Sequence, residues 1–286
     1  MRIALEKYDG LGNDYFIYDP NKNEIKLTEK RVKLICNRHF GAGADGILEG
    51  PFMTESGIEV HIWNPDGSKT EISGNGIRIF AKYLKDANYI QKKRFYISTE
   101  DGQVEICYLN EEGSRIKVAM GKVSFWSDEV PVIGERREVI NEDMVLGNGL
   151  YPATCCSVGN PHCVIPMKEV SKELAIKIGE NTESARYFPN RINTQIMKVI
   201  DENNIQIEIY ERGAGYTIAS GTGACAAAAV AYKLGVTNNG VDVHMPGGIL
   251  QVEIDEAWNA YMTGDVSYIG AMTLGSEFVE KVRALV

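Results

Sequence analysis

The sequence contains one short phrase twice, and this repetition limits the possible folds more than any other feature of the chain. Residues 73–76 read Ser-Gly-Asn-Gly and open a helix-like run, and residues 220–223 read Ser-Gly-Thr-Gly and open another. Both runs end in lysine, tyrosine and leucine, and the two copies lie half a chain length apart. A duplicated chain can fold into two similar halves, so that two matching groups reach one small molecule from opposite sides.

Length and charge set the broad class of the protein. With 286 residues the chain is long enough for two domains, each with its own core. A net charge of −9 and a pI near 5.1 argue against a nucleic-acid partner, because nucleic-acid binding relies on a basic face. No apolar stretch approaches the length of a membrane span, and the N-terminus alternates like a strand and lacks a secretory signal. We therefore expect a cytoplasmic protein without a membrane partner.

Neither the cysteines nor the glycine-rich segment at residues 41–46 predicts a cofactor. The six cysteines show no Cys-x-x-Cys pair and no histidine at zinc-ligand spacing, so we expect no metal, no disulfide and mostly buried thiols. Residues 41–46 match Gly-x-Gly-x-x-Gly by letter. They follow a helix-like run rather than a strand, which argues against a dinucleotide site.

The chain reads as strand-rich, with a few well-defined helices. The amphipathic pattern predicts a helix at 29–38, beside the two that follow the repeated phrase. Alternation predicts strands at 57–63, 94–98, 103–108, 115–120, 154–158, 163–165, 194–199, 205–210, 240–245 and 249–254. Each half therefore runs through strands, a Gly-rich turn, a helix and more strands. We expect an N-terminal domain at 1–122 and a C-terminal domain at 123–271, with a tail at 272–286 that packs back on the first.

The two Gly-x-Gly turns are candidate sites for an anion. A helix N-terminus presents unpaired N–H groups, and glycine lets a carboxylate approach the backbone closely. The simpler interpretation is that Ser73 and Ser220 only cap their helices. The duplication and the polar clusters near both turns favour a binding role.

Further polar residues add to this reading. Glu211 and Arg212 stand side by side before glycines and could bind the two charges of a zwitterion, although a solvated surface pair is the alternative. His162 either tunes a neighbouring acid or base or is a structural histidine. Asn13, Asn64 and Asn193 supply amides of the kind that read polar ligands.

Six segments, at 10–14, 64–67, 74–78, 159–162, 211–215 and 221–225, resemble diaminopimelate epimerase in order and spacing along the whole chain. The resemblance implies an α/β fold of two pseudo-symmetric domains, each a curled mixed sheet around a central helix, with the active site between them. It implies an isomerase that needs neither pyridoxal phosphate nor metal and inverts an α-carbon by two-base proton transfer. The family often forms dimers, which makes a homodimer an option for this chain.

The resemblance also assigns roles to residues. The substrate would be held by Asn13, Asn64, Gly74, Asn75, Asn160, Asn193, Glu211, Arg212, Gly221 and Thr222, with backbone donors at both Gly-x-Gly turns. His162 and Glu211 would modulate the two catalytic residues. The expected substrate is a small zwitterionic amino acid, with LL- to meso-diaminopimelate as the leading reaction.

The catalytic positions depart from the family pattern. Where the family has its cysteine acid–base pair, this chain has Ser73 and Ser220. A hydroxyl is far less acidic than a thiol and needs an adjacent base to act. The serines are either engineered replacements or natural, and other departures such as Tyr216 and Ile79 favour natural divergence. Three functions therefore stay open: the epimerase reaction, racemisation of another amino acid such as histidine, and non-catalytic amino-acid binding.

Overall fold

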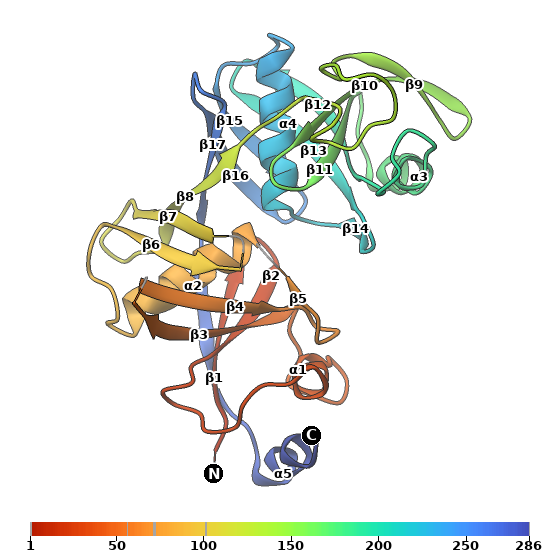
Figure 1. The fold of residues 1–286 in the computed structure, drawn as a ribbon. Coiled ribbons are helices and arrows are strands. Elements are labelled where there is room, and N and C mark those ends of the chain that lie inside the picture. The colour runs from red at the N-terminus through yellow and green to blue at the C-terminus, as the bar shows by residue number, and fades with distance from the viewer. Residues whose placement is uncertain (1, 56, 71–72, 101, 286) are drawn as a thin grey trace. The chain divides into compact units, whose positions relative to one another are not determined.

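The computed structural model describes residues 2–55, 57–70, 73–100 and 102–285 (Figure 1). The chain is a mixed α/β protein that divides into two compact units. Unit 1 consists of the chain up to Val118 together with the segment from Gly264 onward, and unit 2 is Ala119–Thr263. Strands β8 (Arg115–Lys122) and β17 (Asn259–Asp265) each have residues in both units.

Unit 1 contains the first seven strands of the chain and also β18, which lies near the C-terminus. Its other elements are β1 (Ala4–Gly10), β2 (Asn13–Tyr18), α1 (Glu29–Cys36), β3 (Gly46–Thr54), β4 (Gly57–Trp63), β5 (Lys69–Thr70), α2 (Gly74–Asp86), β6 (Arg94–Thr99), β7 (Gly102–Tyr108), β18 (Ser267–Thr273) and α5 (Ser276–Ala284). The strand β1 pairs with β18 and β2, β3 runs parallel to β2, and β4 pairs with β3, β5 and, in parallel, β6. The strand β7 then joins β6 to β8.

The C-terminal segment is attached to unit 1 at two places. Strand β18 pairs antiparallel with β1 from Ala4–Thr273 to Asp9–Ser267. Helix α5 contacts α1, where the Arg31 side chain donates from Nε to the backbone oxygen of Val282 at 3.1 Å.

Unit 2 repeats the same plan. Its elements are β9 (Glu142–Leu146), β10 (Gly149–Ser157), β11 (Pro161–Pro166), α3 (Lys172–Glu183), β12 (Asn193–Asp201), β13 (Asn204–Glu211), β14 (Gly215–Thr217), α4 (Gly221–Lys233), β15 (Gly240–Met245) and β16 (Gly248–Ile254), with most of β17. The strand β10 pairs with β9 and β11, β12 runs parallel to β11, and β13 pairs with β12, β14 and, in parallel, β15. The strand β16 joins β15 to β17.

The two units therefore have the same internal topology. In each, a helix (α1 or α3) connects two parallel strands, and a second helix (α2 or α4) follows a very short strand and leads into another parallel one. By this correspondence, β2 is equivalent to β11, β4 to β13, and α2 to α4. The expected fold class, two similar halves built from mixed sheets around helices, is confirmed.

The two helices that follow the repeated phrase, α2 and α4, pack against the strands of their own units. Helix α4 contacts β10, β11, β12, β13, β15 and β16, and in Figure 1 it lies among these strands. Its sequence is nearly all alanine from Ala224 to Ala231, which combines high helix propensity with a side chain small enough to let strands approach on every side. Helix α2 instead fills unit 1 with large buried side chains such as Ile77, Phe80 and Tyr83.

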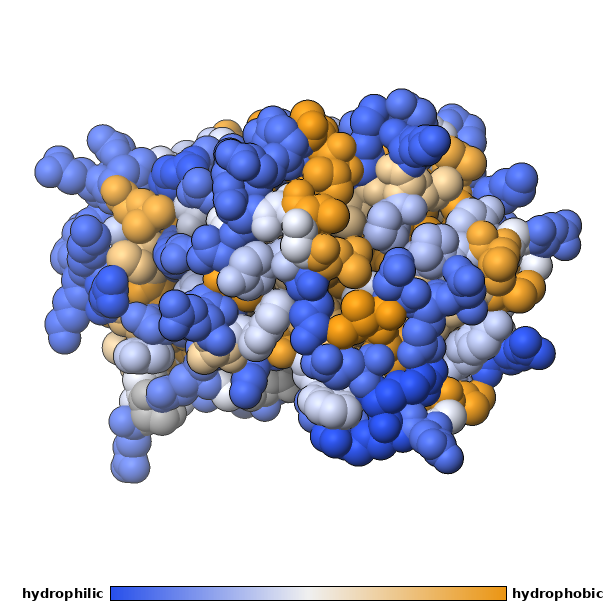
Figure 2. Space-filling view, turned by 90° about the horizontal axis from the view of Figure 1, so that it is seen from above, coloured by the Kyte–Doolittle hydropathy of each residue, from blue (hydrophilic) through white to orange (hydrophobic). Residues whose placement is uncertain are grey.

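Hydrophilic side chains cover most of the one face of the molecule that Figure 2 shows. Separate apolar patches lie between charged side chains on this face. Among the residues described, none of the helices combines the length and the apolar character that crossing a membrane requires.

Candidate active site

Both serines of the repeated phrase lie at helix N-termini. Ser73 has extended backbone, and its Oγ accepts the backbone N–H of Gly76 at 3.1 Å. Ser220 does the same for Gly223 at 3.2 Å. The hydroxyls therefore act as N-caps, as the simpler interpretation expected. Capping uses each serine oxygen as an acceptor only, so each hydroxyl proton is still available to a second partner.

In unit 1, a directed chain of hydrogen bonds orders the residues at the start of α2. The buried Arg78 donates to Asn75 Oδ1 at 2.7 Å, Asn75 Nδ2 donates to Asn13 Oδ1 at 3.3 Å, and Asn13 Nδ2 donates to Asp45 Oδ2 at 3.0 Å. A guanidinium at one end and a carboxylate at the other fix which way both amides point. Each asparagine uses one amide N–H in these bonds and has a second one.

Asp45 is the last acceptor in this series of hydrogen bonds, and other contacts hold its carboxylate in place. Its Oδ1 accepts from Arg38 at 2.7 Å, and its Oδ2 also accepts the backbone N–H of Asp14 at 3.2 Å. The segment 41–46, which the sequence excluded as a dinucleotide loop, thus supplies a carboxylate that orients Asn13.

A residue that the sequence did not single out lies beside Ser73. The hydroxyl of Tyr15 is 3.4 Å from Ser73 Oγ, and either oxygen can be the donor. Tyr15 lies on β2 and is buried, whereas Ser73 is half-buried. The site residues named from the sequence therefore omit one titratable neighbour of Ser73.

In unit 2, the titratable neighbour of Ser220 is Glu211. Glu211 ends β13 and is half-buried beside the hydroxyls of Ser220 and Thr217. Burial raises the pKa of the Glu211 carboxyl, and hydrogen bonding by Ser220 and Thr217 opposes this rise. The serine hydroxyl in unit 2 thus has a carboxylate acceptor next to it.

His162 is fully buried on β11 and has an amide at each ring nitrogen. Its Nε2 is 2.8 Å from Asn160 Oδ1, and its Nδ1 is 3.1 Å from Gln195 Oε1. Burial lowers the pKa of His162 to about 4, although the Gln195 contact opposes the shift and the Arg212 charge adds to it. The imidazole is therefore neutral near pH 7.

The remaining residues of unit 2 that the sequence named form a group with His162. Asn160 Nδ2 donates to Thr222 Oγ1 at 3.4 Å, which joins the β11 segment to the first turn of α4. Asn193 accepts the backbone N–H of Arg212 at 2.9 Å and donates to Pro161 O at 2.9 Å. The parallel register that sets His162 opposite Asn193 brings these strands together.

Some named residues are not joined to these groups. Asn64, which follows β4, donates to Ser68 Oγ at 3.0 Å within its own turn. The Arg212 guanidinium is exposed and donates to Asn190 O at 3.1 Å. The other named residues form one group in each unit. The group in unit 1 consists of Asn13, Ser73, Gly74 and Asn75. The group in unit 2 consists of Asn160, His162, Asn193, Glu211, the Arg212 backbone, Ser220, Gly221 and Thr222.

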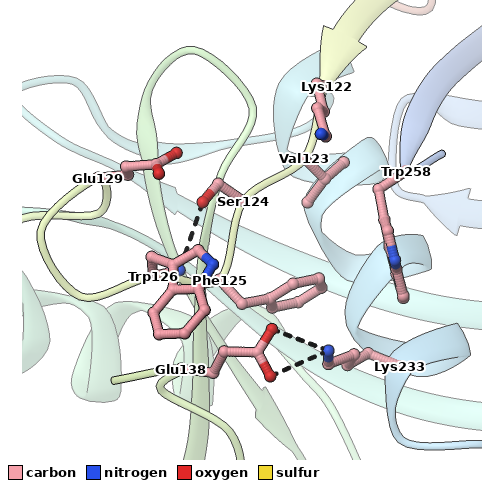
Figure 3. A pocket seen from close by; sticks show the side chains of 9 residues that line it. All are labelled: Lys122, Val123, Ser124, Phe125, Trp126, Glu129, Glu138, Lys233 and Trp258. Atoms are coloured by element: carbon pink, nitrogen blue, oxygen red, sulfur yellow. Dashed lines mark hydrogen bonds and ion pairs between the residues drawn. The ribbon is translucent and has the colours of Figure 1, made fainter. Parts of the chain in front are cut away.

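A separate cavity of about 310 Å³ lies at the other end of α4 (Figure 3). Its lining includes Phe125, Trp258 and Lys233, and the Lys233 ammonium contacts both rings. Lys233 also donates to Glu138 at 3.0 Å, so its charge is already paired. Ser220 and Lys233 are separated by the whole length of α4, about 20 Å at 1.5 Å per residue. The cavity is therefore not the site predicted from the sequence.

Sequence comparisons match both halves of the chain to one family. The family model described as diaminopimelate epimerase matches residues 5–126 and 154–269. "Diaminopimelate epimerase 2" of Nostoc sp. (strain PCC 7120) is 46% identical over 276 residues, covering 96% of both chains. The diaminopimelate epimerase of Caldanaerobacter subterraneus subsp. tengcongensis is 35% identical over 269 residues, covering 93% of this chain and 97% of the relative.

Solved structures show the same fold at low identity. A probable proline racemase from Agrobacterium radiobacter K84 has a TM-score of 0.71 at 12% identity, covering 96% of this chain and 93% of that one. A hydroxyproline epimerase from Agrobacterium vitis has a TM-score of 0.69 at 11% identity, covering 96% and 91%. With its sequence matches covering both halves, the chain belongs to the diaminopimelate epimerase family of isomerases.

Proposed function

We propose that this protein is a cofactor-independent amino-acid epimerase that exchanges the α-proton of diaminopimelate by two-base proton transfer. The observation that carries the proposal is the duplicated arrangement: a serine hydroxyl at a helix N-terminus, with polar amides and one titratable partner, occurs once in each unit. The Nostoc relative named diaminopimelate epimerase 2 supports the choice of substrate.

The proposal assigns a role to each group. Backbone N–H groups at Gly74, Asn75, Gly221 and Thr222 lack intrahelical acceptors and would bind carboxylate oxygens of the substrate. The amides Asn13, Asn64, Asn160 and Asn193 would fix its polar ends, and Glu211 with Arg212 would bind its ammonium and carboxylate. Ser73 would handle the proton on one face of the α-carbon and Ser220 on the other. His162, neutral near pH 7, would modulate this transfer by holding Asn160.

Incubation with LL-diaminopimelate in deuterated water tests the reaction. We expect deuterium at the α-carbon and formation of the meso isomer, both reduced at least tenfold by Ser220→Ala. The matched control is Ser171→Ala, which removes the N-cap of α3, where Ser171 Oγ accepts from Leu174 N at 3.3 Å. Both variants lose a cap of about 1 kcal/mol, but only Ser220→Ala removes a proposed proton carrier. Equal rates in these two variants would contradict the proposal.

The Asp45 contact yields a second prediction, about affinity. In Asp45→Asn one carboxylate oxygen becomes an NH₂ group, so either Asn13 or Arg38 loses its acceptor and Asn13 is held less firmly in its orientation. We expect meso-diaminopimelate to bind about tenfold more weakly in calorimetry, which corresponds to loss of about one hydrogen bond. Asp86→Asn removes a carboxylate from the other end of α2 and should leave the affinity unchanged. Unchanged affinity in Asp45→Asn would show that the chain of amides does not orient the ligand.

A different amino acid is the alternative substrate, and Tyr216 motivates it because this residue departs from the family pattern. Tyr216 on β14 donates to Glu208 at 2.7 Å, close in sequence to the proposed ligand-binding Glu211 and Arg212. A racemisation screen in deuterated water across the common amino acids, including histidine, separates this case from the diaminopimelate reaction. Saturable binding without exchange of any substrate would indicate a non-catalytic binding protein.

A further inference from the structure

The internal repeat gives Tyr15 a counterpart in unit 2. Strand β2 of unit 1 corresponds to β11 of unit 2, and an asparagine precedes or opens each of them: Asn13 in one case and Asn160 in the other. Two residues after each asparagine stands a buried side chain with a titratable group, Tyr15 and His162. The two occupy the same position of the repeat, although their chemistry differs.

Tyr15 is held in contact with the serine of its own unit. Its hydroxyl is 3.4 Å from Ser73 Oγ, and its residue is only 5% exposed. The ring lies against Gly46 of β3, where an added Cβ would come within 2.5 Å of Tyr15 Cε1 and 2.4 Å of the Trp63 carbonyl oxygen. The absence of a side chain at Gly46 thus gives the ring its place beside the N-terminus of α2.

The contact matters because a serine hydroxyl needs a base. Ser73 Oγ already accepts the Gly76 N–H at 3.1 Å, so its own proton can point to another oxygen. A phenol ordinarily has a pKa of about 10, several units below that of an aliphatic hydroxyl, and its phenolate is a usable proton acceptor. In unit 2 the titratable group beside Ser220 is the Glu211 carboxylate, which comes from a different position of the repeat, on β13.

We propose that Tyr15 exchanges a proton with Ser73 and thereby enables the Ser73 hydroxyl to act on the substrate, a role that rests on the epimerase function proposed above. When the α-C–H bond breaks, an O–H bond forms at Ser73 Oγ and the proton already on Oγ passes to the Tyr15 phenolate. The electron pair stays on the α-carbon, delocalised into the substrate carboxylate. In the reverse direction the Tyr15 phenol returns its proton to Oγ as Oγ gives one to carbon. Tyr15 acts through Ser73 and is a positioning residue.

The test is a double-mutant cycle of Tyr15→Phe and Ser73→Cys, with deuterium incorporation into diaminopimelate as the readout. Phenylalanine keeps the ring on Gly46 and removes only the hydroxyl. In the unsubstituted chain we expect Tyr15→Phe to lower kcat at least tenfold with KM changed less than threefold. In the protein carrying Ser73→Cys, the same change should lower kcat less than threefold, because a thiol with a pKa near 8.5 ionises without a phenolate beside it.

Tyr108→Phe is the matched control. It removes another buried phenol hydroxyl of unit 1, one that donates to Ala81 O at 2.6 Å, and should leave kcat unchanged. An equal loss from Tyr15→Phe with serine or cysteine at position 73 would show a structural role, and no loss in either would show no role; both overturn the inference. Absence of exchange in the unsubstituted chain, with exchange restored by Ser73→Cys and Ser220→Cys together, also overturns it. Absence of exchange in every protein overturns the proposed function itself.

Discussion

The protein carrying both Ser73→Cys and Ser220→Cys should epimerise LL-diaminopimelate at least about 100-fold faster than the unsubstituted chain at pH 8, within the range that a positioned acid or base contributes. At that pH roughly a quarter of the molecules of a thiol with pKa 8.5 are ionised, and a helix N-terminus increases this fraction. A serine hydroxyl reaches a comparable basicity only through its neighbour, Tyr15 or Glu211.

The cysteine replacements should also change the stability of the protein, and a cysteine at another helix cap should not raise the rate. Cysteine caps a helix poorly, so each replacement should lower the free energy of unfolding by about 1 kcal/mol while the rate rises. Ser171→Cys places a thiol at another N-cap of unit 2 and should lower stability equally with no gain in rate. If neither the unsubstituted chain nor the double replacement exchanges the α-proton while diaminopimelate still binds, the chain is a binding protein on an epimerase fold.

Acidification should destabilise unit 2 through His162. Burial holds the pKa of the folded-state imidazole at about 4, whereas an unfolded histidine titrates near 6.5. The unfolded state therefore binds more protons between these values, and folding stability rises with pH across that window. The contribution is fully present above about pH 6.5 and is lost as the pH falls to about 4, a change of about 3 kcal/mol for His162.

Urea unfolding at a series of pH values measures this slope. His162→Gln should remove most of it between pH 4 and 6.5, and NMR titration of the His162 ring should place its pKa in the same low range. His244→Gln is the control, because His244 is a half-buried histidine of the same unit whose ring contacts Asn204 at 2.9 Å. A wild-type slope retained in His162→Gln would contradict the assignment to His162.

Local signals predicted the helix starts of the site. The phrases at Ser73 and Ser220 each combine an N-cap residue with a helix-forming run, and α2 and α4 begin directly after these serines as expected. The helix expected at 29–38 is also present, but it ends at Cys36 because Asn37 takes extended backbone. Five of the six cysteines are buried, as expected, and only Cys107 is half-buried.

Elements without strong local signals were missed. Helix α3 contains Gly179, which weakens a helical pattern, yet an added Cβ there would lie 2.3 Å from Tyr210 Cβ. The glycine is thus set by packing between α3 and β13, which a single segment of sequence does not reveal.

The hydrogen-bonded chain from Arg78 to Asp45 was beyond prediction for a related reason. It depends on how α2, β2 and the loop before β3 come together, not on spacing along the chain. Tyr15 could have been found from the sequence by aligning the two halves. Asn13 and Asn160 then fall together, and Tyr15 falls on His162.

The division of the chain sets the order in which the two units can be completed during translation. Unit 2 is one continuous stretch, Ala119–Thr263, so all its strands have been synthesised before β18 is. Unit 1 cannot be completed before β18 and α5 are synthesised, because β1 pairs with β18 and Arg31 donates to the Val282 carbonyl oxygen. Domains usually complete from the N-terminal end as the ribosome proceeds. Here the second unit can close first, while β1 keeps an unpaired edge until β18 has been synthesised.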